Sequence, residues 1–386
     1  MRIAIISSQV FSLLNFRGAL IVDLVAAGVE VFAFAPDFDP GTRKRIEELG
    51  AYPMHVSLNR TSLNVANDVI AALKLSRCLR GLKVDASLAY FVKPVIFGTL
   101  AARIAGVKKR YAIIEGLGFV YSRGSSQSSI KKYFSRMVVN WLYKFALIEV
   151  ERVFFLNSID RAEFVSLKIV RPAKTVLLPG IGVDLNFWSF SEPVFQPISF
   201  LLAARLLREK GVLEFVSAAR RIKITHPTTR FILLGCVDSN PNSFSVEEIN
   251  AWVSEGLIEW PGFVDVKPWL KKTSVFVLPS YYREGVPRST QEALAMGKPV
   301  ITTDWTGCRD TVVEGVNGFL VPPRDVDAIV QAMQRFLERP ELINEMGLRS
   351  RALAEKRFDV SKINLRFLEV LGVMSRSVPK SLSSSR

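Results

Sequence analysis

Short runs of β-branched and other apolar residues alternate along the chain with longer segments in which apolar residues recur at helical spacing. This alternation is typical of layered α/β domains with parallel strands between helices. In the first half, the expected strands cover 2–7, 29–35, 86–90, 110–114, 153–156 and 175–178. In the second half, they cover 198–203, 230–234, 258–260, 275–278 and 300–302. The pattern predicts two doubly wound α/β units.

A segment with two prolines, S-F-S-E-P-V-F-Q-P, lies between these halves and has the composition of a linker. A chain of 386 residues also exceeds what one core accommodates and fits two domains of ordinary size. We therefore expect an N-terminal domain over 1–188 and a C-terminal domain over 198–360. A helix over 361–374 is a candidate to pack back on the N-terminal domain, and 375–386 has the composition of a flexible tail.

Composition excludes several classes of protein. The three cysteines, Cys78, Cys236 and Cys308, form no C-x-x-C pair, so neither a disulfide framework nor a zinc cluster is indicated. Two histidines are too few for a histidine-rich metal site, and they argue against a Ser-His-Asp hydrolase. Every long apolar segment is broken by charges, and the first residues are typical of a buried strand rather than a signal peptide. These features predict a cytoplasmic protein without a membrane-spanning helix.

The net charge of +15 is unevenly distributed. Residues 1–188 hold 25 lysines and arginines against 14 aspartates and glutamates, which accounts for +11 of the total. Glu115 is the single acid among eight bases, which are Arg103, Lys108, Lys109, Arg110, Arg123, Lys131, Lys132 and Arg136. Such a patch suits phosphates, whether of anionic lipid, a diphosphate-linked substrate or nucleic acid.

The stretch 275–304 carries the most specific signal. It consists of an apolar run, V-F-V-L-P-S, a loop, Y-Y-R-E-G-V-P-R, a helical segment, S-T-Q-E-A-L-A-M-G, and a second apolar run, P-V-I-T-T-D. Glu284 follows the first strand, at the sheet edge where ligands bind in open parallel sheets, and Glu292 follows eight residues later at a helix start. Glu292 also has a structural interpretation, because S-T-Q-E is a capping box. For Glu284 no structural duty is evident, and a ligand hydroxyl is the better hypothesis.

Three other turns carry candidate residues. Arg205 and Lys210, in L-L-A-A-R-L-L-R-E-K-G, follow the first strand of the second half. In N-F-R-G, Gly18 stands where the backbone must approach a ligand or turn sharply, and in I-I-E-G-L-G, Glu115 follows a strand. For each of these the alternative is an ordinary turn with solvated charge.

The segment 130–148 mixes bases and aromatic residues at helical spacing. It is either a packed helix with solvated lysines or an interfacial helix on a lipid surface. The interfacial interpretation places Phe134, Trp141 and Phe145 among lipid headgroups and Lys131, Lys132 and Arg136 against phosphates.

A D-x-D pattern, Asp37-Phe38-Asp39, could chelate a metal ion. It lies between two prolines with no third ligand in view, and three-residue matches are common by chance. We expect no metal site.

Several of these motifs together resemble family-four retaining glycosyltransferases of the GT-B fold. The segment E-G-V-P-R-S-T-Q-E-A matches the E-x7-E motif of that family, and the resemblance continues through G-K-P-V-I-T-T-D-W-T-G-C-R-D and E-G-V-N-G-F-L-V-P-P-R-D. R-x4-K-G is a second family pattern, and E-G-L-G is similar to a bacterial subgroup that builds surface polysaccharides and lipid-linked glycans. The resemblance implies two Rossmann-like domains that face each other across a cleft.

The resemblance also implies roles for the donor-side residues. Glu284 would bind hydroxyls of the transferred sugar, and Glu292 the nucleotide ribose, since carboxylates accept hydrogen bonds from vicinal hydroxyls. Arg205 and Lys210 would bind the donor diphosphate and stabilise the charge that develops on it. The remaining donor-binding candidates are Gly18, Gly285, Val286, Pro287, Ser289, Thr290 and, beside the base, Val264.

On the acceptor side, many family members have a histidine near the position of Glu115, so that Glu115 would face the acceptor. Arg17, Lys131, Lys132, Arg136 and Trp141 are the candidates for contact with the acceptor or the membrane. The resemblance implies a front-face mechanism in which the departing phosphate oxygen helps to deprotonate the acceptor hydroxyl.

The implied function is transfer of a hexose or N-acetylhexosamine from a nucleotide-sugar to a polyprenyl-diphosphate-linked saccharide, with retention and without a metal or other cofactor. Such an enzyme would act as a peripheral protein on the inner face of the cytoplasmic membrane. Two alternatives remain: a GT-B enzyme of other chemistry, such as an epimerase or phosphorylase, and a basic nucleic-acid-binding protein without catalytic activity. The absence of a recognisable nucleic-acid module in the sequence argues against the second.

Overall fold

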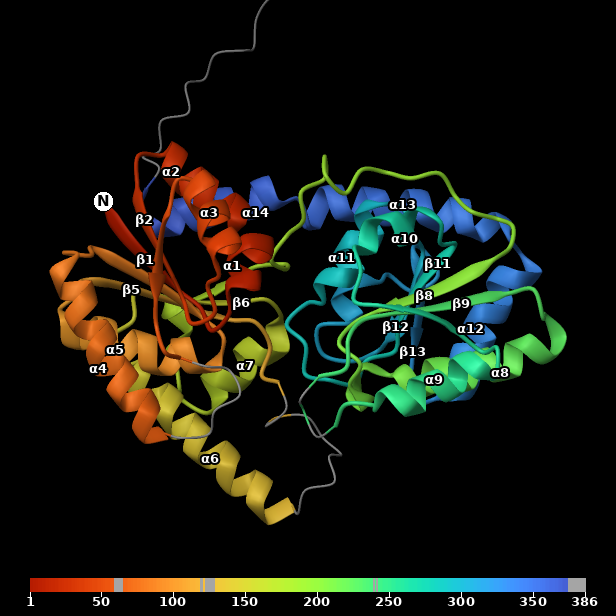
Figure 1. Cartoon of the computed structure of the whole chain (residues 1–386), viewed down its shortest axis with the longest axis horizontal. Helices are drawn as coiled ribbons and strands as arrows, with labels where there is room; N and C mark the ends of the chain where they lie inside the picture. Colours follow the sequence, from red (N-terminus) through yellow and green to blue (C-terminus); the bar gives the residue numbers. More distant parts are fainter. Residues whose placement is uncertain (59–64, 119–120, 122–128, 239, 241, 374–386) are drawn as a thin grey trace, which may run out of the picture.

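Two parallel sheets form the framework of the computed structural model, which describes residues 1–58, 65–118, 121, 129–238, 240 and 242–373. In Figure 1, the N-terminal sheet and its helices lie at the left, and the C-terminal sheet and its helices lie at the right. Their inner strands are short apolar runs buried on both faces, as in Arg2–Ile6 and Val275–Leu278, because helices cover both sides of each sheet.

The N-terminal sheet has the strand order β3-β2-β1-β4-β5-β6-β7 among the described residues. Its strands are β1 Arg2–Ile6, β2 Glu30–Ala35, β3 Tyr52–His55, β4 Ala86–Tyr90, β5 Lys109–Ile114, β6 Arg152–Phe155 and β7 Thr175–Leu177. The helices are α1 Val10–Phe16, α2 Gly18–Ala26, α3 Pro40–Glu48, α4 Val65–Gly81, α5 Thr99–Ala105, α6 Ser129–Ala146 and α7 Ser158–Ser166, with a π-turn at Pro94–Gly98 and a 3₁₀ turn at Pro172–Lys174.

The C-terminal sheet has the order β10-β9-β8-β11-β12-β13. Its strands are β8 Ser199–Ala203, β9 Arg230–Leu234, β10 Glu259–Gly262, β11 Val275–Leu278, β12 Val300–Thr303 and β13 Gly318–Val321. The helices are α8 Val212–Thr225, α9 Val246–Ser254, α10 Val266–Lys271, α11 Arg288–Ala295, α12 Val326–Glu338 and α13 Glu341–Arg357, with 3₁₀ turns at Arg208–Lys210 and Arg309–Thr311.

Each sheet reverses its winding direction at one point. In the N-terminal sheet this switch lies between β1 and β4, and in the C-terminal sheet between β8 and β11. Adjacent loops leave the sheet in opposite directions at such a point, which opens a crevice at the carboxyl ends of the strands. The loops that carry Arg205 and Glu284 begin directly after β8 and β11.

Two strands were missed in the sequence, and both lie at sheet edges. β3 contains Pro53 and is only half-buried, so it lacks the continuous apolar run by which the other strands were identified. β13 is short and begins at Gly318, and it pairs with β12 alone.

The final described helix, α14 (Val360–Leu371), lies against the N-terminal domain rather than the C-terminal one. Asn364 Nδ2 donates to Asp23 Oδ2 of α2 at 2.7 Å, and the rings of Phe367 and Phe154 lie 4.5 Å apart. In Figure 1, α13 runs along the C-terminal domain and α14 continues beside α2. A continuous set of buried side chains therefore joins the facing sides of the two domains, and it includes Val183, Val286, Phe358 and Ile363.

Candidate functional site

Lys210 and Glu284 form the centre of the donor side. Lys210 ends the 3₁₀ turn after β8, Glu284 lies in the loop after β11, and the Lys210 ammonium contacts the Glu284 carboxylate. Ser280 Oγ lies 3.1 Å from the same carboxylate oxygen, and both charged side chains are largely buried. A cation and a carboxylate thus stand side by side at the switch point of the sheet.

Arg205 lies beside this pair. Its guanidinium is 3.3 Å from Asp238 Oδ2 and 6.0 Å from the centre of the Tyr282 ring, while Lys210 Nζ is 5.3 Å from the same ring. The glycine of the R-x4-K-G pattern has a packing reason, because Gly211 has a left-handed backbone and a Cβ there would meet Pro279 O at 2.3 Å. The structure brings both predicted cations to one edge of the sheet.

The capping-box interpretation of Glu292 is wrong. Helix α11 begins at Arg288 with Pro287 as its N-cap, so Ser289 is not the cap and Glu292 lies in the second turn. Its carboxylate instead accepts from Arg288 Nε at 2.7 Å. Burial raises the pKa of Glu292, and the guanidinium of Arg288 opposes that shift.

The other donor-side candidates surround the start of α11. Gly285, Val286 and Pro287 form the buried loop before the helix, and Ser289 and Thr290 lie in its first turn, where backbone N–H groups have no partner within the helix. Val264 lies elsewhere on the donor domain, between β10 and α10, and packs against the apolar residues of the core. The role of these six residues in donor binding stays a prediction.

Across the cleft, Arg17 and Glu115 form a buried ion pair. Glu115 follows β5, and Arg17 lies between α1 and α2 with its guanidinium 5.0 Å from the Tyr90 ring and 5.8 Å from the Phe367 ring. Burial raises the pKa of Glu115, and Arg17 and then Arg288 oppose the shift. Arg288 of the donor helix therefore lies close enough to act electrostatically on the acceptor-side carboxylate.

For Arg17 and Gly18 of the N-F-R-G segment, the structure contradicts the membrane contact and the sharp turn, and it leaves acceptor contact by Arg17 as a prediction. Arg17 is 1% exposed, so it cannot contact a lipid surface, although its Nε is buried without a hydrogen-bond partner. Gly18 is the first residue of α2, has no left-handed backbone, and would accommodate a Cβ at ordinary contact distances of 3.7 Å or more. A sharp turn therefore does not explain this glycine, and its approach to a ligand stays a prediction.

Helix α6 carries the candidates for the membrane side. The exposed apolar residues Tyr133, Met137, Trp141 and Phe145 recur every four residues, which places them in one stripe, and Trp141 stacks on Phe145 at 5.8 Å. Arg136 contacts Glu163 of α7 at 2.5 Å instead of pointing wholly to solvent. The side chains of Lys131, Lys132 and Phe134 lie outside the described residues.

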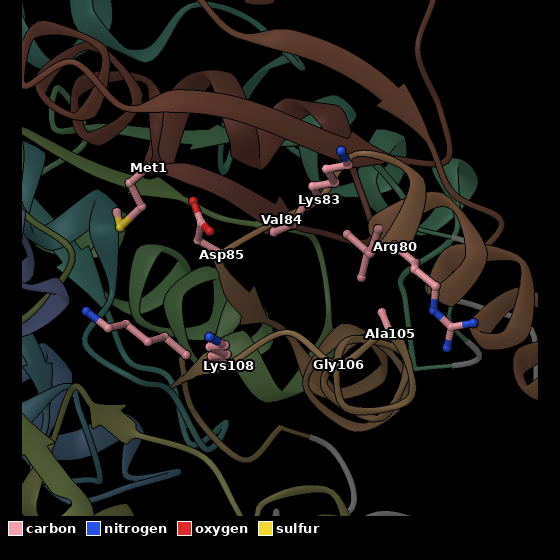
Figure 2. A pocket seen from close by; sticks show the side chains of 10 residues that line it. Met1, Arg80, Lys83, Val84, Asp85, Ala105, Gly106 and Lys108 are labelled. Atoms are coloured by element: carbon pink, nitrogen blue, oxygen red, sulfur yellow. The ribbon is translucent and has the colours of Figure 1, made fainter.

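The basic patch seen in the sequence is divided in space. Lys108 and Lys109 lie at the amino end of β5, with Arg80 and Lys83 around a shallow pocket that Figure 2 shows, whereas Glu115 lies at the other end of that strand. Arg110 is buried and donates to Val107 O at 2.5 Å and Glu149 O at 2.9 Å. Arg123 lies outside the described residues. The described part of the chain therefore shows no single phosphate-binding surface formed by these bases.

The two aspartates of the D-x-D pattern have local structural duties. Asp39 caps α3 by accepting from Thr42 N at 2.8 Å, and Asp37 accepts from Val10 N at 2.7 Å. Within the described residues, no three histidine, cysteine or acidic side chains are grouped as metal ligands. No described helix combines the length and apolar composition needed to cross a membrane.

Four residues that the sequence did not single out complete the site. Arg288 bridges Glu292 and the ring of Phe16, which lies 5.2 Å from its guanidinium. Gln291 is buried, accepts from Gly182 N at 3.0 Å and donates to Val286 O at 3.1 Å, so it links the domain junction to the donor loop. Asn157 and Arg283 join this loop to the N-terminal domain. Only the position of Arg283 beside Glu284 could have drawn attention to it in the sequence.

Comparison with known proteins places this geometry in a family. Residues 197–339, which include β8 to α12 and the donor-side candidates other than Gly18, match the family described as Glycosyl transferases group 1. The second domain of the chain is therefore similar to the group 1 glycosyltransferases. The chain shares 28% identity, over 98% of its length and 100% of the relative's, with the N,N'-diacetylbacillosaminyl-diphospho-undecaprenol alpha-1,3-N-acetylgalactosaminyltransferase of Campylobacter jejuni.

A second relative is the UDP-Gal:alpha-D-GlcNAc-diphosphoundecaprenol alpha-1,3-galactosyltransferase of Escherichia coli, with 26% identity over 78% of each chain. Among solved structures, sucrose-phosphate synthase from Thermosynechococcus elongatus matches with a TM-score of 0.78 at 19% identity over 96% of this chain and 98% of that one. HepE of Anabaena in complex with UDP-glucose matches with a TM-score of 0.75 at 18% identity over 97% and 100%. The glycosyltransferase has the GT-B fold predicted from its sequence.

Proposed function

We propose that this glycosyltransferase moves a hexosyl or N-acetylhexosaminyl group from a nucleoside-diphosphate sugar to a hydroxyl of a polyprenyl-diphosphate-linked saccharide, with retention of the anomeric configuration. The observation that carries the proposal is the Lys210–Glu284 pair at the switch point of the donor sheet. The pair supplies an ammonium group that binds a phosphate oxygen and, in contact with it, a carboxylate that accepts a hydrogen bond from a sugar hydroxyl. The two undecaprenol-diphosphate-dependent relatives support the choice of acceptor.

The donor-side groups have complementary tasks in this proposal. Lys210 and Arg205 bind the diphosphate, whose negative charge increases as the bond to the sugar breaks, so fixed cations stabilise the transition state more than the ground state. Glu284 accepts hydrogen bonds from sugar hydroxyls and Glu292 from the ribose. No metal or other cofactor has a task in this scheme.

In the transfer step, the bond between the anomeric carbon and the diphosphate oxygen breaks, and a bond to the acceptor oxygen forms on the same face. The proton of the acceptor hydroxyl passes to the departing diphosphate oxygen. In this proposal, Glu115 of the N-terminal domain, which pairs with Arg17, binds the acceptor. Exclusion of water by the two domains suppresses hydrolysis of the donor.

The lipid-linked acceptor requires access to a membrane surface. The stripe of Tyr133, Met137, Trp141 and Phe145 on α6 supports peripheral binding through an interfacial helix. A nucleotide-sugar donor further favours the inner face of the cytoplasmic membrane as the site of action.

A transfer assay tests the function. The wild type is incubated with UDP- and GDP-linked hexoses and N-acetylhexosamines and with a polyprenyl-diphosphate disaccharide, and NMR of the product determines the anomeric configuration. Transfer of one sugar with retention supports the proposal. Conversion of the donor without an acceptor indicates an epimerase instead, and transfer with inversion contradicts the mechanism.

A further inference from the structure

The loop 281–287, here called the donor loop, belongs to the C-terminal domain but is bound by the N-terminal domain. Asn157 Nδ2 donates to Gly285 O at 2.9 Å and lies 3.3 Å from Glu284 O. The backbone N–H of Gly118 donates to Arg283 O at 3.2 Å. Each backbone carbonyl from Arg283 to Gly285 therefore accepts from a group of the opposite domain.

The side chain of Arg283 adds a charged contact to the same domain. Its Nη2 lies 2.6 Å from Asp160 Oδ1 and 2.7 Å from Glu163 Oε2, both on α7. The three side chains are largely buried, and burial raises the pKa of Asp160 while Arg283 opposes the shift. Charged hydrogen bonds at this depth are strong and dependent on geometry, so the arginine fixes the loop in one position.

Asn157 and Asp160 are themselves held rigidly. Asn157 follows β6 and caps α7, with Oδ1 accepting from Asp160 N at 2.8 Å and Nδ2 donating to Asp160 Oδ2 at 2.9 Å. This local network orients the amide towards the donor loop and the aspartate towards Arg283. The binding surface is therefore built into the start of one helix.

The backbone of the donor loop is closely packed on two sides. A Cβ on Gly116 would meet Gly285 N at 2.5 Å, and a Cβ on Gly307 would meet Gly285 O at 2.2 Å. The loop is thus enclosed between a glycine of the N-terminal domain and a glycine of its own domain. Movement of one domain relative to the other must displace Glu284 or break these contacts.

We infer that Arg283 is a positioning residue, which holds Glu284 in its sugar-binding position by anchoring the donor loop to Asp160 and Glu163 of the acceptor domain. The inference rests on the proposed function, because it concerns the grip of Glu284 on the transferred sugar. Neither the guanidinium nor its two carboxylate partners need touch the substrate.

The same network reaches the helix that carries the exposed apolar stripe. Glu163 Oε1 accepts from Arg136 of α6 at 2.5 Å, while Glu163 Oε2 contacts Arg283. One carboxylate therefore binds one arginine from α6 and one from the donor loop. Glu163 thus links α6 to the loop that carries Glu284.

The kinetic test compares Arg283→Gln and Arg283→Lys with a matched control, Arg208→Gln, which removes an arginine from an exposed ion pair of the same domain. Misplacement of a substrate group by about 1 Å costs on the order of 100-fold in rate, so we expect a loss of about that size in kcat for transfer by the glutamine variant. The Kd of the free nucleoside diphosphate should change less than about twofold, because Arg205, Lys210 and Glu292 remain. The lysine variant keeps the positive charge but lacks the planar guanidinium group, so it should recover part of kcat.

An unchanged kcat in Arg283→Gln overturns the inference, and so does an equal loss of kcat and nucleotide affinity, which would indicate general unfolding of the site. If the glutamine variant does not fold, Glu163→Gln gives the same test, because it weakens the contact while Arg283 keeps Asp160 as its charged partner.

Amide hydrogen exchange of 281–287 separates this inference from the proposed function. Faster exchange of these amides in Arg283→Gln than in Arg208→Gln supports the anchoring even if no nucleotide-sugar is transferred by the wild type. Equal exchange in both variants overturns the anchoring even if the wild type transfers sugar.

Discussion

The ammonium of Lys210 and the carboxylate of Glu284 are in contact, although 74 residues separate them in the chain. Each alone resembles a charged residue in a strand-to-helix turn. Together, they make the carboxyl edge of β8 and β11 able to bind a phosphate and a hydroxyl at neighbouring points.

Lys210→Ala should weaken binding of the matching nucleoside diphosphate by about 10- to 100-fold, because a hydrogen bond to a charged group contributes roughly 1.5 to 3 kcal/mol. Calorimetry with UDP, GDP, dTDP and ADP, without added metal, measures this. Glu284→Gln is the matched comparison: it should keep the diphosphate affinity and lose transfer. Equal binding by the wild type and Lys210→Ala would contradict the diphosphate role.

Glu292→Gln should weaken nucleoside-diphosphate binding without lowering the melting temperature by more than about 2 °C, since Glu292 does not cap α11 and its bond to Arg288 is confined to one helix face. Calorimetry and thermal unfolding check the two parts. A large loss of stability with unchanged nucleotide affinity would restore a purely structural role.

Gly116→Ala should abolish transfer and destabilise the protein by several kcal/mol, because the new Cβ would lie 2.5 Å from Gly285 N and Gly116 has a left-handed backbone. Thermal unfolding and the transfer assay measure both effects. Gly81→Ala is the control, since nothing lies within 4 Å of its Cβ position. Near-wild-type behaviour of Gly116→Ala would mean that the domain contact is looser than described.

Trp141→Ala should reduce sedimentation with anionic lipid vesicles by about tenfold, as expected when a large aromatic side chain no longer enters the headgroup layer. Trp141 is 64% exposed. Ile224→Ala, at a 78% exposed residue of α8 on the other domain, is the control and should bind vesicles like the wild type. Equal sedimentation of all three proteins would leave the stripe without a role at the membrane.

Lys298 provides a test of pH dependence. Burial lowers the pKa of this lysine from 10.5 to about 8, and its Nζ lies 3.3 Å from Glu192 O. Below pH 8 both the folded and unfolded states bind the proton, so the cost of burial is constant. Between pH 8 and 10.5 only the unfolded state keeps the proton, so this group raises the free energy of unfolding as the pH rises.

Lys298→Met should therefore melt at a higher temperature than the wild type at pH 7. Its free energy of unfolding should exceed that of the wild type by at most roughly 3 kcal/mol. That advantage should shrink as the pH approaches 10. Thermal unfolding from pH 7 to 10 measures it, with Lys271→Met on the exposed side of α10 as the control. If the difference in melting temperature between Lys298→Met and the wild type does not change with pH, the lowered pKa of Lys298 is contradicted.

The donor-side candidates could be named from the sequence because they are close along the chain. Glu284, Gly285 and Glu292 lie within one strand-loop-helix unit, and Arg205 and Lys210 within one turn, so short motifs and their resemblance to a family were enough to name them, while their roles stay predictions. Capping was the local feature that failed: α11 begins at Arg288, one residue before Ser289, and its N-cap Pro287 makes no side-chain hydrogen bond, so Ser289 lies inside the first turn.

The sequence by itself determined most of the strands, the α/β class and the chemical types at the donor edge, since apolar periodicity and short motifs are local properties. The tertiary structure decided which side chains meet. It buried Arg17 against Glu115, turned Arg136 towards Glu163, and set Arg283 against Asp160 over a separation of 123 residues. The first two contacts depend on how the helices and loops of the N-terminal domain pack, and the third on how the two domains pack. Contacts between residues far apart in the sequence produce no repeating pattern of apolar and polar residues.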